Sequence, residues 1–109
     1  MTQHDRLQRL QVLAQMIRDR DMARLQKLAQ ARTDTRDRAQ RLLQTVPLAQ
    51  DPTLFAARQL HAKWAQEQRI RLNRTLALQT ARMIEQRDKT ARSHGRADVL
   101  ARLCRQKPR

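Results

Sequence analysis

The sequence predicts an all-α fold, an antiparallel two-helix coiled-coil hairpin with a short C-terminal helical extension after Gly95. Ala, Leu, Gln and Arg dominate the 109 residues, and all four are good helix formers. Gly95 is the only glycine and there are three prolines, so few positions can turn the chain. Residues typical of strands are scarce, with one Phe and no Tyr. The length indicates a single domain.

The first helix is expected over residues 3–45. Thr2 and Asp5 resemble a capping box at its start. Its inward positions alternate spacings of three and four, as a coiled-coil seam requires, with one stutter at 17→21→25: Leu7, Leu10, Ala14, Ile17, Asp21, Leu25, Leu28, Arg32, Thr35, Ala39, Leu42 and Val46. The polar members of this set leave two interpretations open. Either they are partly buried with the arginine stem along the seam, or this part of the seam is loose and bends or repacks.

Residues 46–51 are expected to connect the helices. Pro47 disfavours helical geometry at Val46, and Asp51 followed by Pro52 is typical of an N-cap and the first helical position. A loop this short predicts an antiparallel second helix over residues 52–94. Helices of equal length would then pair residues whose numbers sum to about 97.

The second helix holds the only Trp and the only Phe of the chain. One side of its helical wheel carries Leu54, Ala57, His61, Ala65, Gln68, Leu72, Leu76, Gln79 and Met83, and a shorter stripe roughly opposite carries Ile70, Ala77, Ala81 and Ile84. One apolar face suffices to pack against one neighbour. The second stripe therefore predicts a further binding partner.

The extension over residues 95–107 is helical by pattern, and either continues the second helix or bends at Gly95. It has no partner within the hairpin as predicted. A helix of about ten residues is marginal alone in water. We therefore expect Val99, Leu100 and Leu103 to contact another molecule.

The chain has a net charge of +14, from 24 basic and 10 acidic residues. That excess favours an anionic partner, which could be nucleic acid, an anionic membrane surface or an acidic protein. Basic residues of the second helix could neutralise phosphates: Arg69, Arg71, Arg74, Arg82, Arg87, Lys89 and Arg92. They circle the helix, however, and no aromatic residues are interleaved with them for base stacking. A basic nucleic-acid-associated helical protein remains the first alternative.

Side chains that could support catalysis are few and scattered. Cys104 is the only cysteine, which excludes an internal disulfide and a thiolate-rich zinc site. The three histidines lie far apart in the sequence, and there is no glycine-rich phosphate loop. We expect no enzyme activity, no cofactor and no metal site. No apolar run approaches the about 18 residues that span a bilayer, and the N-terminus lacks a signal peptide's apolar core. We expect a cytoplasmic protein without membrane insertion.

A small, basic, Arg/Gln/Ala-rich hairpin with the segment GRADVLARL at residues 95–103 resembles the central stalk proteins of flagellar and type III secretion export ATPases, the FliJ-like and YscO-like proteins. The resemblance implies a non-enzymatic stalk or adaptor that inserts into an ATPase hexamer, links it to the export gate, and is peripheral at the export apparatus. The shortness of this chain departs from that pattern. The region carried over is residues 87–103, the end of the rod expected to enter the ring.

The predicted partner-binding residues combine the outer stripe with this end: Ile70, Ala77, Ala81, Ile84, Arg87, Arg92, Arg96, Val99, Leu100 and Leu103. A second alternative is a homodimer in which two hairpins form a four-helix bundle that serves as a scaffold. The sequence leaves a monomer and a homodimer both open.

Overall fold

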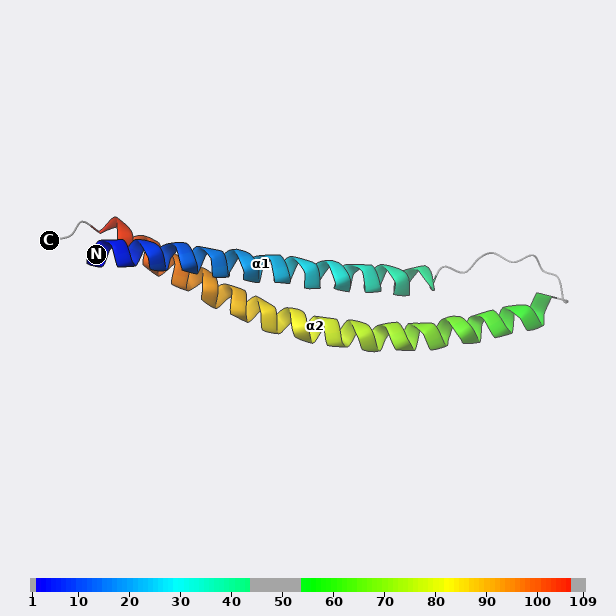
Figure 1. Cartoon of the computed structure of the whole chain (residues 1–109). Coiled ribbons are helices and arrows are strands. Elements are labelled where there is room, and N and C mark those ends of the chain that lie inside the picture. Colours follow the sequence, from blue (N-terminus) through cyan, green and yellow to red (C-terminus); the bar gives the residue numbers. More distant parts are fainter. Residues whose placement is uncertain (1, 44–53, 107–109) are drawn as a thin grey trace. The chain divides into compact units, whose positions relative to one another are not determined.

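The computed structural model describes residues 2–43 and 54–106. Two helices account for nearly all of them, α1 (Gln3–Arg41) and α2 (Phe55–Arg105), and the described residues contain no strand (Figure 1). The two helices pack against each other in antiparallel fashion, which confirms the all-α hairpin. The predicted connection at 46–51 and the last residue of the predicted extension lie outside the described residues.

The start of α1 is a reciprocal capping box. The Thr2 backbone N–H donates to Asp5 Oδ2 at 3.3 Å, and the Asp5 backbone N–H donates to Thr2 Oγ1 at 3.2 Å. These bonds satisfy two of the donors that every helix N-terminus leaves open. At its other end α1 stops at Arg41 rather than at residue 45, and the Leu43 N–H bonds to Gln40 O in a tighter final turn.

Of the two alternatives left open at Gly95, the structure supports continuation, because α2 runs without a break through Gly95 to Arg105. Gly95 has no positive φ, and a Cβ added there would meet nothing within 4 Å. A glycine inside a helix costs only about 1 kcal/mol relative to alanine. Ser93 and Ala97 are both buried on either side of it, so packing holds the helix through this position. The extension is therefore helical, as predicted, but it is the last part of α2.

The chain forms two compact units. The first unit contains Met1–Ala29 and Arg82–Arg109, and the second contains Gln30–Ala81. In each unit a segment of α1 packs against a segment of α2. Both helices contribute residues to both units.

The buried and half-buried positions include two series at seven-residue spacing on each helix, as expected of a coiled-coil seam. On α1 the series are His4, Gln11, Arg18, Leu25, Arg32, Ala39 and Leu7, Ala14, Asp21, Leu28, Thr35, Leu42. On α2 they are Ala65, Leu72, Gln79, Gln86, Ser93, Leu100 and Arg69, Leu76, Met83, Thr90, Ala97, Cys104. The sequence predicted most of these positions on α1, but on α2 it predicted only Ala65, Leu72, Leu76, Gln79 and Met83.

Two predicted seam residues of α1 lie outside it. Leu10 is 50% exposed and Ile17 is 41% exposed, while Gln11 and Arg18 take the half-buried positions. The heptad spacing is therefore regular, and the predicted stutter is absent. The sequence interpretation placed leucine and isoleucine inward because they are apolar, but the regular heptad places them beside the seam.

The predicted pairing register is also wrong. Arg32 Nε donates to Thr80 Oγ1 at 2.9 Å in the second unit, and Asp21 bonds with residues 86–93 in the first. Paired residue numbers therefore sum to about 112, whereas the predicted sum was about 97. The shift of about 15 residues is close to two heptads, so the same faces of the helices meet in either register.

The polar seam residues explain which register is adopted. In the predicted register Arg32 would face Ala65, which offers its guanidinium no acceptor. In the observed register Arg32 has Thr80 as its acceptor, and the buried Thr35 hydroxyl donates to Ala31 O at 3.0 Å within its own helix. Buried polar groups are costly unless they are hydrogen-bonded. These bonds favour the interpretation of a partly buried seam over that of a loose region.

The observed register also differs from the predicted one in what lies opposite the first turns of α2. The end of α1 at Arg41 lies level with about residue 70 of α2 by this pairing. The first turns of α2 therefore have no counterpart in the described part of α1. Three residues predicted to face inward there, Leu54, Ala57 and His61, are exposed. The His61 ring instead lies 5.7 Å from the Trp64 ring, centroid to centroid.

A substitution at Gly95 tests the continuous helix. Because Gly95→Ala adds a Cβ that meets nothing, it should stabilise the hairpin by about 1 kcal/mol. Its melting temperature, followed by circular dichroism at the helical band, should rise by about 4–8 °C. Ala91→Gly, at an exposed position of the same helix, should lower it by a similar amount. A lower melting temperature for Gly95→Ala would mean that Gly95 is needed to break the helix.

Candidate functional site

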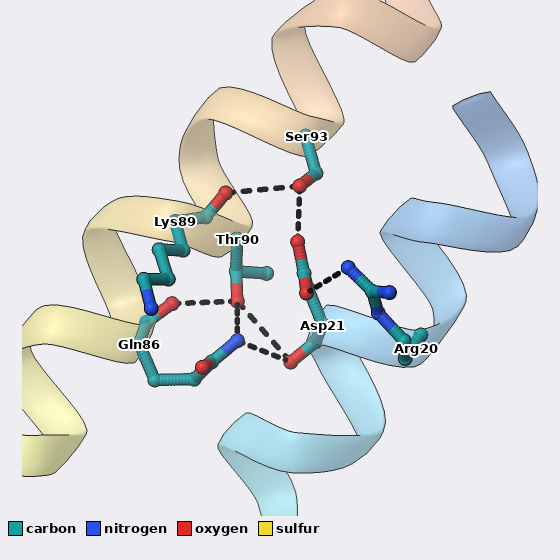
Figure 2. Close-up of polar contacts among 6 residues, drawn as sticks. All are labelled: Arg20, Asp21, Gln86, Lys89, Thr90 and Ser93. Atoms are coloured by element: carbon teal, nitrogen blue, oxygen red, sulfur yellow. Dashed lines mark hydrogen bonds and ion pairs between the residues drawn. The ribbon is translucent and has the colours of Figure 1, made fainter.

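The largest cluster of cross-helix hydrogen bonds lies in the first unit, around Asp21 (Figure 2). The Asp21 side chain on α1 accepts a hydrogen bond from the Ser93 hydroxyl on α2. The Asp21 backbone carbonyl accepts from Gln86 Nε2 at 3.1 Å and from Thr90 Oγ1 at 3.3 Å. Arg20 Nη2 lies 3.7 Å from the other carboxylate oxygen. Asp21 is only 5% exposed, so this carboxylate depends on these partners.

The α2 side chains of the cluster also bond within their own helix. Ser93 Oγ lies 3.0 Å from Lys89 O, and Thr90 Oγ1 lies 2.7 Å from Gln86 O. The second N–H of the Gln86 amide points to Thr90 Oγ1 at 3.4 Å. Contacts within α2, as well as those with Asp21, therefore hold the three polar side chains in place.

These contacts change the acidity of the carboxyl group. The hydrogen bond from Ser93 lowers the pKa of Asp21 below its usual value of 3.8, burial opposes this, and the positive charge of Arg20 lowers the pKa further. The net shift is downward, so the folded hairpin favours the ionised carboxylate.

The cluster has the features of contacts that fix the register between the two helices, and it lacks those of a reactive site. The Ser93 hydroxyl has a carboxylate beside it, but no histidine is bonded to either group. Among residues 2–43 and 54–106, no group of three or more His, Cys, Asp or Glu side chains is placed to hold a metal ion. The hydrogen bonds of the cluster are directed between the two helices. Their arrangement fixes which turn of α2 lies against Asp21.

An apolar groove lies in the same unit, close to the cluster. It has a volume of about 660 Å³ and is lined by residues of both helices: Leu10, Leu13, Ala14 and Ile17 of α1, with Ser93, Gly95, Arg96, Val99 and Leu100 of α2. A second hollow of about 600 Å³ shares Leu13 and continues along α1 past Val12 to Asp5. The first unit therefore presents two hollows that share Leu13 as a lining residue.

The predicted partner-binding residues are mostly on the surface. Ile70, Ala77 and Ala81 are exposed in the second unit, and Ile84 is exposed in the first, with 47% exposure for Ile70 and 50% for Ile84. In the first unit, the arginines 87, 92 and 96 are exposed together with Val99 and Leu103, and Leu100 is half-buried.

The structure brings three of these residues together with residues from the other helix. Arg96, Val99 and Leu100 line the groove with the α1 residues. The sequence interpretation placed this part of α2 beyond the end of α1, and therefore missed the α1 half of the groove. The signal was available as Leu10, Leu13 and Ile17, which share one face of a helix by their spacing.

The basic residues proposed for phosphate contact are also mostly exposed. Arg69 is the exception, because it lies at a half-buried seam position. In the first unit, His94 Nε2 lies 3.7 Å from Asp98 Oδ2, one turn away on α2.

The geometry defines the class of the molecule as a basic two-helix antiparallel hairpin with an apolar groove. Comparison with known protein families, with characterised proteins and with solved structures finds no match to this chain. Neither helix, within the residues described, contains a segment long and apolar enough to cross a membrane.

The Asp21 cluster makes stability depend on pH. A carboxyl whose pKa is lowered by folding stabilises the protein above its usual pKa, and this contribution is lost as the pH falls through the lowered value. Wild type should therefore lose stability in urea denaturation from below about pH 4. Asp21→Asn should lose less over the same range, because it removes this titration. Asp34→Asn, at an exposed position, is the control and should follow wild type. Parallel curves for wild type and Asp21→Asn would contradict the assignment.

Proposed function

We propose that this chain is a non-enzymatic helical-hairpin adaptor whose partner is the ring of a flagellar or type III secretion export ATPase, which it links to the export gate. The observation that carries the proposal is the position of the large apolar side chains. The buried apolar residues are Ala14, Ala65 and Ala97, and no large side chain in the described residues is completely buried. The apolar surface left outside needs another protein to cover it.

Exposed apolar side chains occur along both helices. They are Leu10, Val12, Leu13, Met16, Ile17, Met22, Leu43, Leu54, Phe55, Leu60, Trp64, Ile70, Leu78, Ile84, Val99 and Leu103. Single exposed apolar residues are ordinary on protein surfaces. Here they outnumber the buried ones, and several share a groove. A partner that binds only the folded hairpin would also stabilise it by mass action.

The charge of the first unit supports a protein partner with acidic or carbonyl acceptors. Its residues, Met1–Ala29 and Arg82–Arg109, include fifteen basic and six acidic side chains, a net charge of +9. Arginine can donate two parallel hydrogen bonds to a carboxylate. The exposed Arg87 and Arg92 lie within residues 87–103, the region carried over from the stalk proteins, and the resemblance to those proteins is what points to an ATPase ring.

Mixing the hairpin with the export ATPase of the same genome tests the proposal. We expect a complex by size-exclusion chromatography and faster ATP hydrolysis. The double variant Arg87→Glu, Arg92→Glu should weaken the complex by roughly tenfold. The matched control is Arg36→Glu, Arg38→Glu, which reverses the same charge at exposed positions of α1 and should bind normally. No complex and no change in hydrolysis would remove the ring from the proposal.

Nucleic-acid binding is favoured by a separate observation, the exposure of Arg71, Arg74, Arg82 and Lys89 along α2. Such binding weakens linearly with the logarithm of salt concentration. A ring complex with apolar contacts should instead persist at high salt. Titration of labelled single-stranded and duplex DNA over a salt series separates the two functions.

A further inference from the structure

We propose that the groove of the first unit receives one amphipathic helix of a partner protein, with leucine-type residues on its apolar face and acidic residues along its margins. The docked helix would cover part of the apolar surface that the proposed function already assigns to partner binding. It rests on the proposed function only in the premise that the hairpin is a protein-binding adaptor, and does not require the ATPase ring.

The shape and lining of the groove suit a helix. Leu10, Leu13 and Ile17 form one wall on α1, and Val99 and Leu100 form the other wall on α2. The three α1 residues have spacings of three and four, so they form a row along the helix axis. Two antiparallel helices with apolar rows on either side of their seam leave a trough into which the apolar face of a third helix packs.

Gly95 lies in the lining and supports the same conclusion. A Cβ at this position would meet nothing within 4 Å, so the hairpin's own packing does not require a glycine here. Its cost is about 1 kcal/mol of helix propensity relative to alanine. What glycine provides is space, because the α2 wall is open to its backbone at this point. A side chain of a docked helix can therefore approach α2 closely beside Arg96.

The charge around the groove selects an acidic partner. Helical spacing places Arg6 and Arg20 at the two ends of the α1 row, and Arg92 one turn before Arg96 on α2. Arg6, Arg92 and Arg96 are exposed, and Arg20 is also exposed although it lies 3.7 Å from Asp21. The acidic residue next to Val99 in sequence, Asp98, lies beside His94. Acidic residues on the margins of a docked helix would therefore meet arginines at both ends of the groove.

The same charge argues against a second copy of this chain. Each first unit has a net charge of +9, so two grooves brought face to face would place like charges together. A nucleic acid would satisfy the arginines but would leave the apolar walls exposed. An acidic amphipathic helix complements both features at once.

A peptide assay tests the proposal with the intact hairpin. The probes are fluorescein-labelled amphipathic helices of about 20 residues, with leucine on one face and glutamate along both margins. Their counterparts carry lysine in place of glutamate. Fluorescence anisotropy should show binding of the acidic peptides and at least about tenfold weaker binding of the basic ones.

Variants of the hairpin locate the bound helix. Gly95→Leu places a side chain in the groove from a position where the added Cβ meets nothing within 4 Å. It should therefore weaken acidic-peptide binding at least about tenfold while the melting temperature stays equal or rises. The matched control Ala91→Leu adds the same side chain at an exposed position outside the lining and should bind like wild type. Arg96→Glu should weaken the acidic peptides and strengthen the basic ones.

Three outcomes would overturn the proposal. One is that no acidic peptide binds more tightly than its basic counterpart. Another is that Gly95→Leu binds as wild type does. The last is that sedimentation shows a wild-type dimer that Gly95→Leu dissociates, which would mean that a second copy fills the groove. The assay contains no ATPase, so the failure of the ring complex and the failure of the peptide complex are separate results.

Discussion

The burial of the Asp21 carboxylate is the constraint on which the rest of the first unit depends. A carboxylate that is 5% exposed in a helix–helix seam requires donors, and Ser93 is the donor that α2 supplies. Gln86 and Thr90 secure the adjacent backbone carbonyl. Together these bonds select one turn of α2 to lie against Asp21. Since both helices are regular on either side, that choice also places residues 93–100 beside residues 10–17 and thereby forms the groove.

The seam packs closely because its side chains are small or polar. As a result, the large apolar side chains lie outside the seam. Ala14, Ala97 and Ser93 are buried and short, so the helices can approach closely but bury little apolar area between them. The larger apolar residues lie on the flanks of the seam. A two-helix hairpin built in this way has modest stability of its own, because apolar burial is the main favourable contribution to folding. The protein partner that we propose would contribute the missing burial by covering the flanks.

The sequence predicted the parts of the structure that depend on local pattern. The all-α hairpin, the capping box at Thr2 and Asp5, and most seam positions follow from helix propensity and heptad spacing. The register did not follow, because a shift of two heptads brings the same faces together and leaves the apolar pattern unchanged. Only the pairing of polar seam residues distinguishes the two registers. To predict the register from the sequence, Asp21 would have to be recognised as the partner of Ser93, a residue far away in the chain. The sequence left the behaviour of Gly95 open, because a single glycine costs a helix little and packing decides whether the helix continues.

The groove and the polar cluster are therefore energetically linked. In the predicted register, the numbers of paired residues sum to about 97. Ala14 would then face Met83, and Gly95 and Val99 would lie beyond the start of α1. The residues of the groove would then be divided between two unrelated surfaces. Because the groove exists only in the register that satisfies Asp21, a helix bound there stabilises that register over the alternative by mass action. Conversely, any change that weakens the hydrogen bond between Asp21 and Ser93 reduces the population of hairpins that can bind. The polar contacts can determine the register because the seam buries alanine rather than leucine. Little buried apolar area would be lost in a change of register, so the hydrogen bonds decide between the two.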